Sequence, residues 1–270
     1  MKSLTSQLKI GKFHSKSNLT SQKNLGNIFR ILNKVQEKFG IEKIENLKTN
    51  HFEKVFQDLK DKGLSNSTLS GYATAARMIA ESIGKQNIFP RDNKDMGISR
   101  AGERLQPQEC NIEKQQDIRG NLYDRAQFLG LAHDMRKEFG LRAKESLLSN
   151  KISVHADGKQ YLVVDGSKGG RPREVEIKND GQREIISKVQ QYIKENGLKS
   201  IIPKELNLKQ AYDLQKNSLK EFGATRHDGS NAHALRHEWA QKEIANGENR
   251  TKVAEELGHG RTDVISHYVR

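Results

Sequence analysis

Cysteine is nearly absent from this sequence: Cys110 is the only one among 270 residues, so no disulfide forms within the chain. No run of about 18 apolar residues occurs, which excludes a membrane-spanning helix. Residues 1–23 also lack the apolar stretch of a secretory signal. These absences predict a protein of the reducing cytoplasm that does not enter a membrane.

Acidic residues are also in short supply: 34 Asp and Glu stand against 47 Lys and Arg, which leaves a net charge of +13. Apolar residues make up 34% of the chain, compared with about 45–50% in soluble domains when glycine is also counted as apolar. Their regular spacing still favours one or two folded domains over a disordered chain. Because Lys and Arg release counterions when they neutralise phosphates, the excess indicates a polyanionic partner. Charge alone does not distinguish DNA, RNA and an anionic surface.

The first third of the chain indicates a basic arm followed by a helical bundle. No acidic residue precedes Glu37, so residues 1–22 are either a solvated tail or an arm that follows DNA. Beyond them, apolar residues recur at the three- and four-residue spacing of amphipathic helices. The side-chain oxygens of residues 65–68 can cap the third helix. The expected helices cover residues 25–39, 49–62 and 65–83, within a domain of residues 23–88.

The rest of the chain divides into a linker and a domain of mixed helix and strand. Glycine, proline and charged residues are frequent over residues 84–118, so we place the linker at 89–118. An apolar-periodic helix over about 120–140 opens the second domain, residues 119–270. Asp157-Gly158 is a typical hairpin turn, and helical spacing returns from about residue 181. Between these helical regions we expect a three-stranded antiparallel sheet, with strands at residues 152–154, 161–164 and 174–177.

Four segments contain residues suited to chemistry, although each is ordinary on its own. Arg142 is most simply a surface arginine paired with an acidic neighbour such as Glu145, and Lys168 is an exposed lysine in a glycine-rich turn. Zinc is disfavoured at His233 and His237, because an arginine between them would repel a cation. The four segments are residues 140–146, 166–170, 233–237 and 257–259, the last followed by Tyr268.

Considered together, these residue types fit a phosphoryl transfer. Two arginines can neutralise the nonbridging oxygens of a phosphodiester, and histidines can hydrogen-bond them or move a proton. A lysine can protonate a departing alkoxide, and a tyrosine can attack phosphorus. The sequence contains no acidic cluster for magnesium and no P-loop for a nucleotide, so we expect neither a metal nor a cofactor.

In their order and spacing, these segments resemble the tyrosine recombinases, the phage-integrase-like site-specific recombinases. The motifs that carry the resemblance are Gly-Leu-Arg-x-x-Glu at 140–145, His-x-Leu-Arg-His at 233–237 and Leu-Gly-His at 257–259, followed by Tyr268. Residues 63–69, Gly-Leu-Ser-Asn-Ser-Thr-Leu, extend it to the helical bundle. The resemblance implies a mainly α fold with a small antiparallel sheet, in which a SAM-like helical core-binding bundle precedes an α+β catalytic domain.

The resemblance implies six catalytic residues: Arg142, Lys168, His233, Arg236, His259 and Tyr268. Arg142 and Arg236 would clamp the scissile phosphate, with His233 as hydrogen-bond partner or base. Lys168 would protonate the 5′-hydroxyl, His259 would stabilise the transition state, and Tyr268 would become the 3′-phosphotyrosyl. The position of Lys168 rests on the turn between two strands, so Arg171 and Arg173 stay open as alternatives for the proton donor.

The resemblance also implies the partners. The two domains would close as a clamp around duplex DNA that carries the recombination sites of a phage or another mobile element, as a homotetramer and with accessory DNA-bending proteins. Many relatives continue past the tyrosine into a segment that docks on a neighbouring protomer, whereas here two residues follow Tyr268, which leaves the mode of assembly open. Two alternatives are a non-catalytic architectural DNA-binding protein and a type IB topoisomerase.

Overall fold

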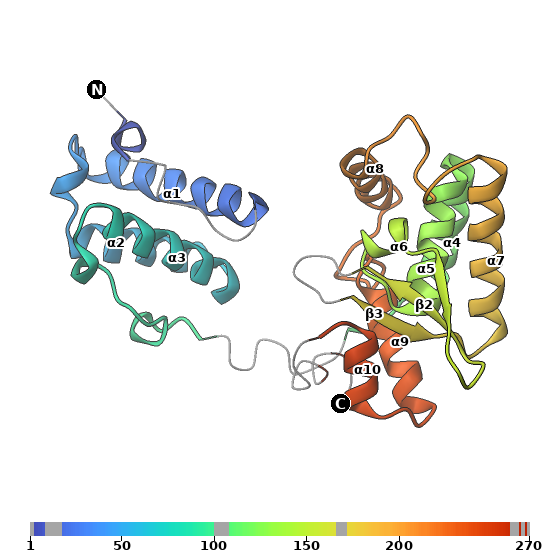
Figure 1. Ribbon diagram of the computed structural model, residues 1–270. Helices are drawn as coiled ribbons and strands as arrows, with labels where there is room; N and C mark the ends of the chain where they lie inside the picture. The colour runs from blue at the N-terminus through green and yellow to red at the C-terminus, as the bar shows by residue number, and fades with distance from the viewer. Residues whose placement is uncertain are drawn as a thin grey trace. The chain divides into compact units, whose positions relative to one another are not determined.

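A computed structural model describes residues 3–8, 18–99, 108–165 and 172–259, together with Ile265 and Tyr268. The chain divides into two compact units, Met1–Glu103 and Arg104–Arg270, each with its own apolar core. Helices dominate both units, and a small antiparallel sheet lies in the second (Figure 1). This architecture confirms the predicted fold class. Among the described helices, none has the length and apolar character that a membrane crossing needs.

The first unit is a helical bundle. Its elements are η1 (Leu4–Gln7), α1 (Asn18–Phe39), η3 (Ile44–Asn46), α2 (Thr49–Asp61), α3 (Asn66–Ser82), η4 (Gln86–Ile88) and η5 (Lys94–Met96). α1 packs against α2 and α3, and its buried face includes Ile28, Ile31 and Val35, as their spacing predicted. Ser65 Oγ accepts a hydrogen bond from the Thr68 amide at 3.3 Å, so the predicted cap of α3 is confirmed.

Two parts of the first unit differ from the prediction. Residues 3–8 are not a solvated arm, because Leu4 and Leu8 are buried in the core of the bundle. The high charge of the surrounding segment concealed the contribution of these two leucines. α1 begins at Asn18, well before Leu25, and the prediction missed its start because residues 20–24 are all polar and carry no apolar periodicity.

The second unit is built around a central helix. Its helices are α4 (Ile112–Arg125), α5 (Gln127–Phe139), α6 (Glu145–Leu148), α7 (Asp180–Glu195), α8 (Leu208–Glu221), α9 (Ala234–Ala245) and α10 (Arg250–Glu256). α5 packs against α4, α7 and α9 (Figure 1). The prediction of one helix over 120–140 is wrong, because Ala126 is extended at φ −168° and separates α4 from α5. α4 also begins inside the predicted linker, 89–118, where Asn111 caps it through the Lys114 amide.

The predicted three-stranded antiparallel sheet is confirmed, and its strands lie in chain order. They are β1 (Lys151–Val154), β2 (Gln160–Val164) and β3 (Arg173–Glu176). Leu162 and Val175 are partners across β2 and β3, and both are buried in the core of the unit. The same register sets Arg173, the first residue of β3, opposite Val164. Residues 166–171, which include Lys168, lie outside the described residues.

Gly140 ends α5 in a conformation and a space that suit only glycine. Its φ is +59°, and a Cβ atom there would lie 2.7 Å from the Trp239 ring. We expect Gly140→Ala to lower the free energy of unfolding by about 2–4 kcal/mol, through left-handed backbone strain and overpacking. Urea unfolding measures this loss. Gly158→Ala is the matched control, since its φ is +81° but no atom lies within 4 Å; it is expected to cost about 1 kcal/mol. Equal losses at the two positions would contradict the packing at Gly140.

Candidate active site

Arg236 is the buried cation of the candidate site, on the first turn of α9. Its Nη1 donates to the Gly140 carbonyl at 2.6 Å, and its Nη2 donates to the Leu257 carbonyl. These carbonyls lie at the C-terminal ends of α5 and α10, where backbone acceptors lack partners within the helix and attract a cation. Burial lowers the pKa of Arg236 to about 10, although Tyr268 acts in the opposite direction. The guanidinium therefore stays charged at neutral pH.

Arg142 is held by a buried carboxylate. Glu145 Oε1 accepts a hydrogen bond from Arg142 Nη1 at 2.8 Å, and Oε2 accepts one from the Arg142 backbone amide at 2.9 Å. Burial opposes ionisation of Glu145, but the hydrogen bonds and charge of Arg173 and the bonds from Arg142 outweigh it and lower the pKa to about 2. The predicted pairing of Arg142 with Glu145 is confirmed. With 26% of its side chain exposed, Arg142 can still reach a ligand.

His259 follows the C-terminal turn of α10. Gly258 adopts φ +68°, and the His259 amide then donates to the Ala254 carbonyl at 2.9 Å. His259 Nε2 lies 3.4 Å from Arg236 Nη2. Burial, followed by the charges of Arg236 and of the neighbouring arginines, lowers the pKa of His259 to about 4. The imidazole is therefore neutral at physiological pH.

Tyr268 brings its hydroxyl to the centre of these groups. The hydroxyl oxygen lies 3.5 Å from Arg236 Nε and 3.5 Å from His233 Nε2. Only 5% of Tyr268 is exposed, so this residue is not part of a frayed terminus. His233 directly precedes α9 and is exposed, which leaves its ring accessible to a ligand.

His237 contacts Tyr268, although the motifs in the sequence predict no role for it. Its ring stacks on that of Tyr268 with centroids 4.4 Å apart and planes 27° apart, and it meets the His233 ring edge-on at 5.1 Å. Because His233 and His237 are four residues apart, the sequence alone could have placed them on one face of a helix. Stacking of this kind restricts the orientation of the tyrosine ring.

Of the three candidates for the proton donor, the structure describes only Arg173. Its Nη2 lies 2.8 Å from Glu145 Oε2, in a buried ion pair that the sequence did not predict. Because this pair occupies the Arg173 guanidinium, Lys168 and Arg171 remain as candidates, and both lie outside the described residues.

The structure brings together five of the six predicted site residues: Arg142, His233, Arg236, His259 and Tyr268. Two guanidinium groups beside two imidazoles can bind a phosphodiester and leave its phosphorus open to the hydroxyl. Over the ranges that the structure covers, no three His, Cys, Asp or Glu residues are grouped so as to hold a metal ion.

The low pKa of His259 predicts a dependence of stability on pH. The pKa is 6.5 without the protein environment and about 4 in the folded chain, so between these values the unfolded chain binds the proton and the folded chain does not. The stability that this group contributes is complete above pH 6.5 and is lost as the pH falls towards 4. In urea titrations over this interval, we expect the wild type to lose more free energy of unfolding than His259→Asn. A parallel loss in the two proteins would contradict a buried, neutral imidazole.

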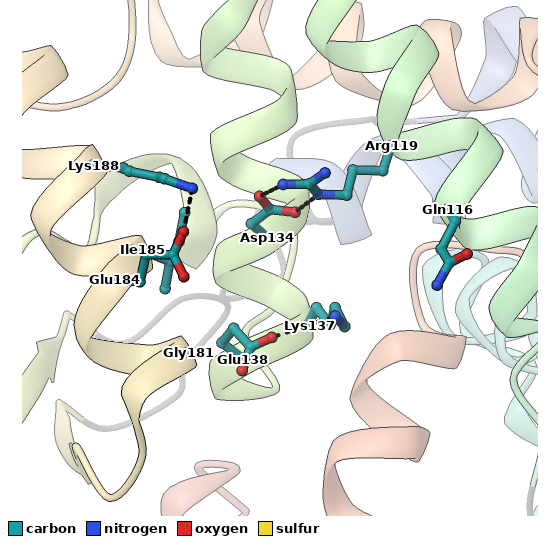
Figure 2. A pocket seen from close by; sticks show the side chains of 9 residues that line it. All are labelled: Gln116, Arg119, Asp134, Lys137, Glu138, Gly181, Glu184, Ile185 and Lys188. Carbon is teal, nitrogen blue, oxygen red and sulfur yellow. Dashed lines mark hydrogen bonds and ion pairs between the residues drawn. The ribbon is translucent and has the colours of Figure 1, made fainter.

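A separate pocket lies between α4, α5 and α7 and is lined by none of the candidate site residues (Figure 2). Its acidic side chains pair with cations inside the pocket. These pairs are Asp134 with Arg119 at 2.6 Å, Glu184 with Lys188 at 2.5 Å and Glu138 with Lys137 at 3.5 Å. Since these charges already balance one another, we assign the chemistry to the residues around Tyr268.

Known structures share the fold of this chain at low sequence identity. XerH site-specific recombinase bound to its difH substrate has 20% identity and a TM-score of 0.64, over 93% of this chain and 76% of that one. A lambda integrase dimer bound to a COC′ core site has 17% identity and a TM-score of 0.60, over 92% and 71%. The Tn1549 transposon integrase with transposon right end DNA has 16% identity and a TM-score of 0.56, over 99% and 93%.

Sequence comparison identifies the family. No curated protein sequence matches the chain. A family model described as Integrase matches residues 97–242, which is more than half of the chain. This match includes Arg142, His233 and Arg236, and the fold agrees with it. The chain therefore belongs to the integrase family of tyrosine recombinases.

Proposed function

We propose that this protein cleaves and rejoins duplex DNA at specific sites, with Tyr268 as the nucleophile that forms a 3′-phosphotyrosyl bond. The observation that supports this most is the position of the Tyr268 hydroxyl, 3.5 Å from both Arg236 Nε and His233 Nε2. A hydroxyl in this position has a fixed cation to hold the phosphate and an imidazole to take its proton.

In the cleavage step, the guanidinium groups of Arg142 and Arg236 bind the nonbridging oxygens of the scissile phosphate. The Tyr268 oxygen forms a bond to phosphorus while its proton passes to His233 Nε2. Because Arg236 is held by two backbone carbonyls, it is already oriented for the charge that develops on the phosphoryl oxygens.

In the same step the bond between phosphorus and the 5′ oxygen breaks. Lys168 gives this oxygen its proton, so that a 5′-hydroxyl leaves. His259, neutral and beside Arg236, donates a hydrogen bond to the phosphoryl oxygens as their charge grows.

Rejoining reverses these transfers on a different strand. The phosphotyrosyl bond retains the energy of the phosphodiester, so a 5′-hydroxyl from a partner strand can attack the phosphorus and release Tyr268. His233 then returns the proton to the tyrosine. We propose that the reaction uses neither ATP nor a metal ion, because the bond energy is conserved and fixed cations carry the charge.

The partners follow from the charge and from the relatives. XerH is seen with its difH substrate, and lambda integrase is seen as a dimer on a core site and as a tetramer on a Holliday junction. The net charge of +13 suits the same class of ligand. We infer that four copies act on duplex sites of a phage or another mobile element, with accessory DNA-bending proteins, in the cytoplasm and on the nucleoid.

A strand-transfer assay tests the proposal. The protein is mixed with nicked duplexes from the DNA that flanks its gene, in EDTA and without a nucleotide. The nick lets the short 5′-hydroxyl fragment leave, so a covalent adduct accumulates, and an added partner strand with a 5′-hydroxyl then converts it into a rejoined product. Tight binding without an adduct would favour an architectural protein, and relaxation of any plasmid by catalytic amounts would favour a topoisomerase.

A further inference from the structure

Arg173 has a nearly buried side chain whose guanidinium connects three segments of the second unit. It is the first residue of β3, and its side chain is only 7% exposed. Its three hydrogen-bonding nitrogens all donate to groups of the protein, none of which belongs to a candidate site residue.

The first connection is to the segment that carries Arg142. Arg173 Nη2 donates to Glu145 Oε2 at 2.8 Å, and Nη1 donates to Oε1 at 3.2 Å, in the two-pronged geometry that fixes a carboxylate most firmly. Each of these oxygens also accepts a hydrogen bond from Arg142. One carboxylate therefore lies between two guanidinium groups, and the group that holds it from the buried side is Arg173.

The second connection is to the turn that carries His259. Arg173 Nε donates to the Glu256 carbonyl at 2.5 Å, at the end of α10. A Cβ atom on Gly258 would lie 3.0 Å from Arg173 Nη1, so the turn passes directly over the guanidinium. Arg142 Nη2 also reaches the Gly258 carbonyl, at 3.4 Å. Arg173 thus links β3 both to the support of Arg142 and to the turn before His259.

We propose that Arg173 is a positioning residue that sets Arg142 and His259 against the scissile phosphate, through Glu145 and the α10 turn. This inference rests on the proposed function. Lysine cannot replace the arginine, because an ammonium group is a single point charge and cannot make the two-pronged contact and the Glu256 contact together.

The test compares single-turnover adduct formation at saturating DNA in the wild type and Arg173→Lys. We expect a rate about 100-fold lower in the variant, the size of effect that a displacement of about 1 Å produces. Affinity for the DNA should change less than about threefold, since Arg173 makes no phosphate contact in this account. Lys178→Met is the matched control: Lys178 pairs with Glu243, Glu248 and Glu256, so it also braces this part of the unit, including α10, but it does not touch Glu145. We expect Lys178→Met to lower the free energy of unfolding and to leave the rate of adduct formation unchanged.

Two results would overturn the inference: a rate within threefold of the wild type, or weaker DNA binding with an unchanged rate. A slow rate in both Arg173→Lys and Lys178→Met would show a general loss of stability, and would overturn it as well. A second readout needs no DNA. If Arg173 acts through Glu145, the double variant Arg173→Lys, Glu145→Gln unfolds at the urea concentration of the weaker single variant, and additive shifts would contradict this. If the wild type itself forms no adduct, the proposed function fails, and the urea experiment still decides whether Arg173 and Glu145 act together.

Discussion

Tyr268→Phe is expected to form no covalent adduct with a nicked duplex that the wild type converts fully. The variant lacks only the hydroxyl oxygen, and the ring can keep its place against His237, where the centroids are 4.4 Å apart. Loss of a nucleophile lowers the rate by about 10⁶-fold in enzymes where it has been isolated. Denaturing electrophoresis of labelled DNA measures the adduct directly.

The control for this variant is Tyr161→Phe. Tyr161 lies on β2 and stacks on His155, with centroids 4.1 Å apart, and it makes no contact with the candidate site within the described part of the chain. This variant should form the adduct at the wild-type rate, and Tyr268→Phe should still bind the duplex. An adduct in Tyr268→Phe would show that another residue attacks the phosphate.

The second large effect is expected at Arg236. Arg236→Lys keeps a positive charge but loses the planar group that reaches the Gly140 and Leu257 carbonyls and Tyr268 at once. Loss of one preorganised donor to a developing oxyanion lowers a rate by about 10²–10³-fold, and we expect a loss of this size in adduct formation. A buried carbonyl left without a donor costs about 1–3 kcal/mol, so the free energy of unfolding should fall as well.

Arg136→Lys separates these two effects. Arg136 is also fully buried, on α5, but it makes none of the contacts of Arg236 with Tyr268 or His259 among the described residues. We expect this variant to lose stability and to form the adduct at a rate within about threefold of the wild type. Equal rate losses in the two variants would mean that Arg236 acts only as a core residue.

Local spacing in the sequence was sufficient to predict much of the site. His233, Arg236 and His237 lie close together in the sequence at the N-terminal end of α9, so their proximity follows from helix geometry. Arg142 and Glu145 are three residues apart in the segment that leads into α6, so their contact is local as well. The sequence also predicted the apolar periodicity of α1, α2 and α3 and the Asp157-Gly158 turn, because each depends only on residues close together in the chain.

Contacts between distant segments could not be predicted in this way. Arg173 meets Glu145 only because β3 and α6 are brought together by the fold, and no spacing links them. Leu4 is buried by helices that lie further along the sequence, so its own neighbours do not reveal its burial. The break at Ala126 ends a helix but does not interrupt the apolar periodicity. The local sequence pattern would be the same whether or not the Arg173–Glu145 contact, the burial of Leu4 and the break at Ala126 existed, so it could not predict them.

The central claim is that Tyr268 becomes joined to DNA through a 3′-phosphate, and peptide mapping of the trapped adduct tests it most directly. The adduct is digested with protease and nuclease, and the peptide that retains a nucleotide is sequenced by mass spectrometry. We predict that the nucleotide lies on Tyr268 and is attached through its 3′-phosphate. A nucleotide on any other residue, or one attached through a 5′-phosphate, would contradict the account.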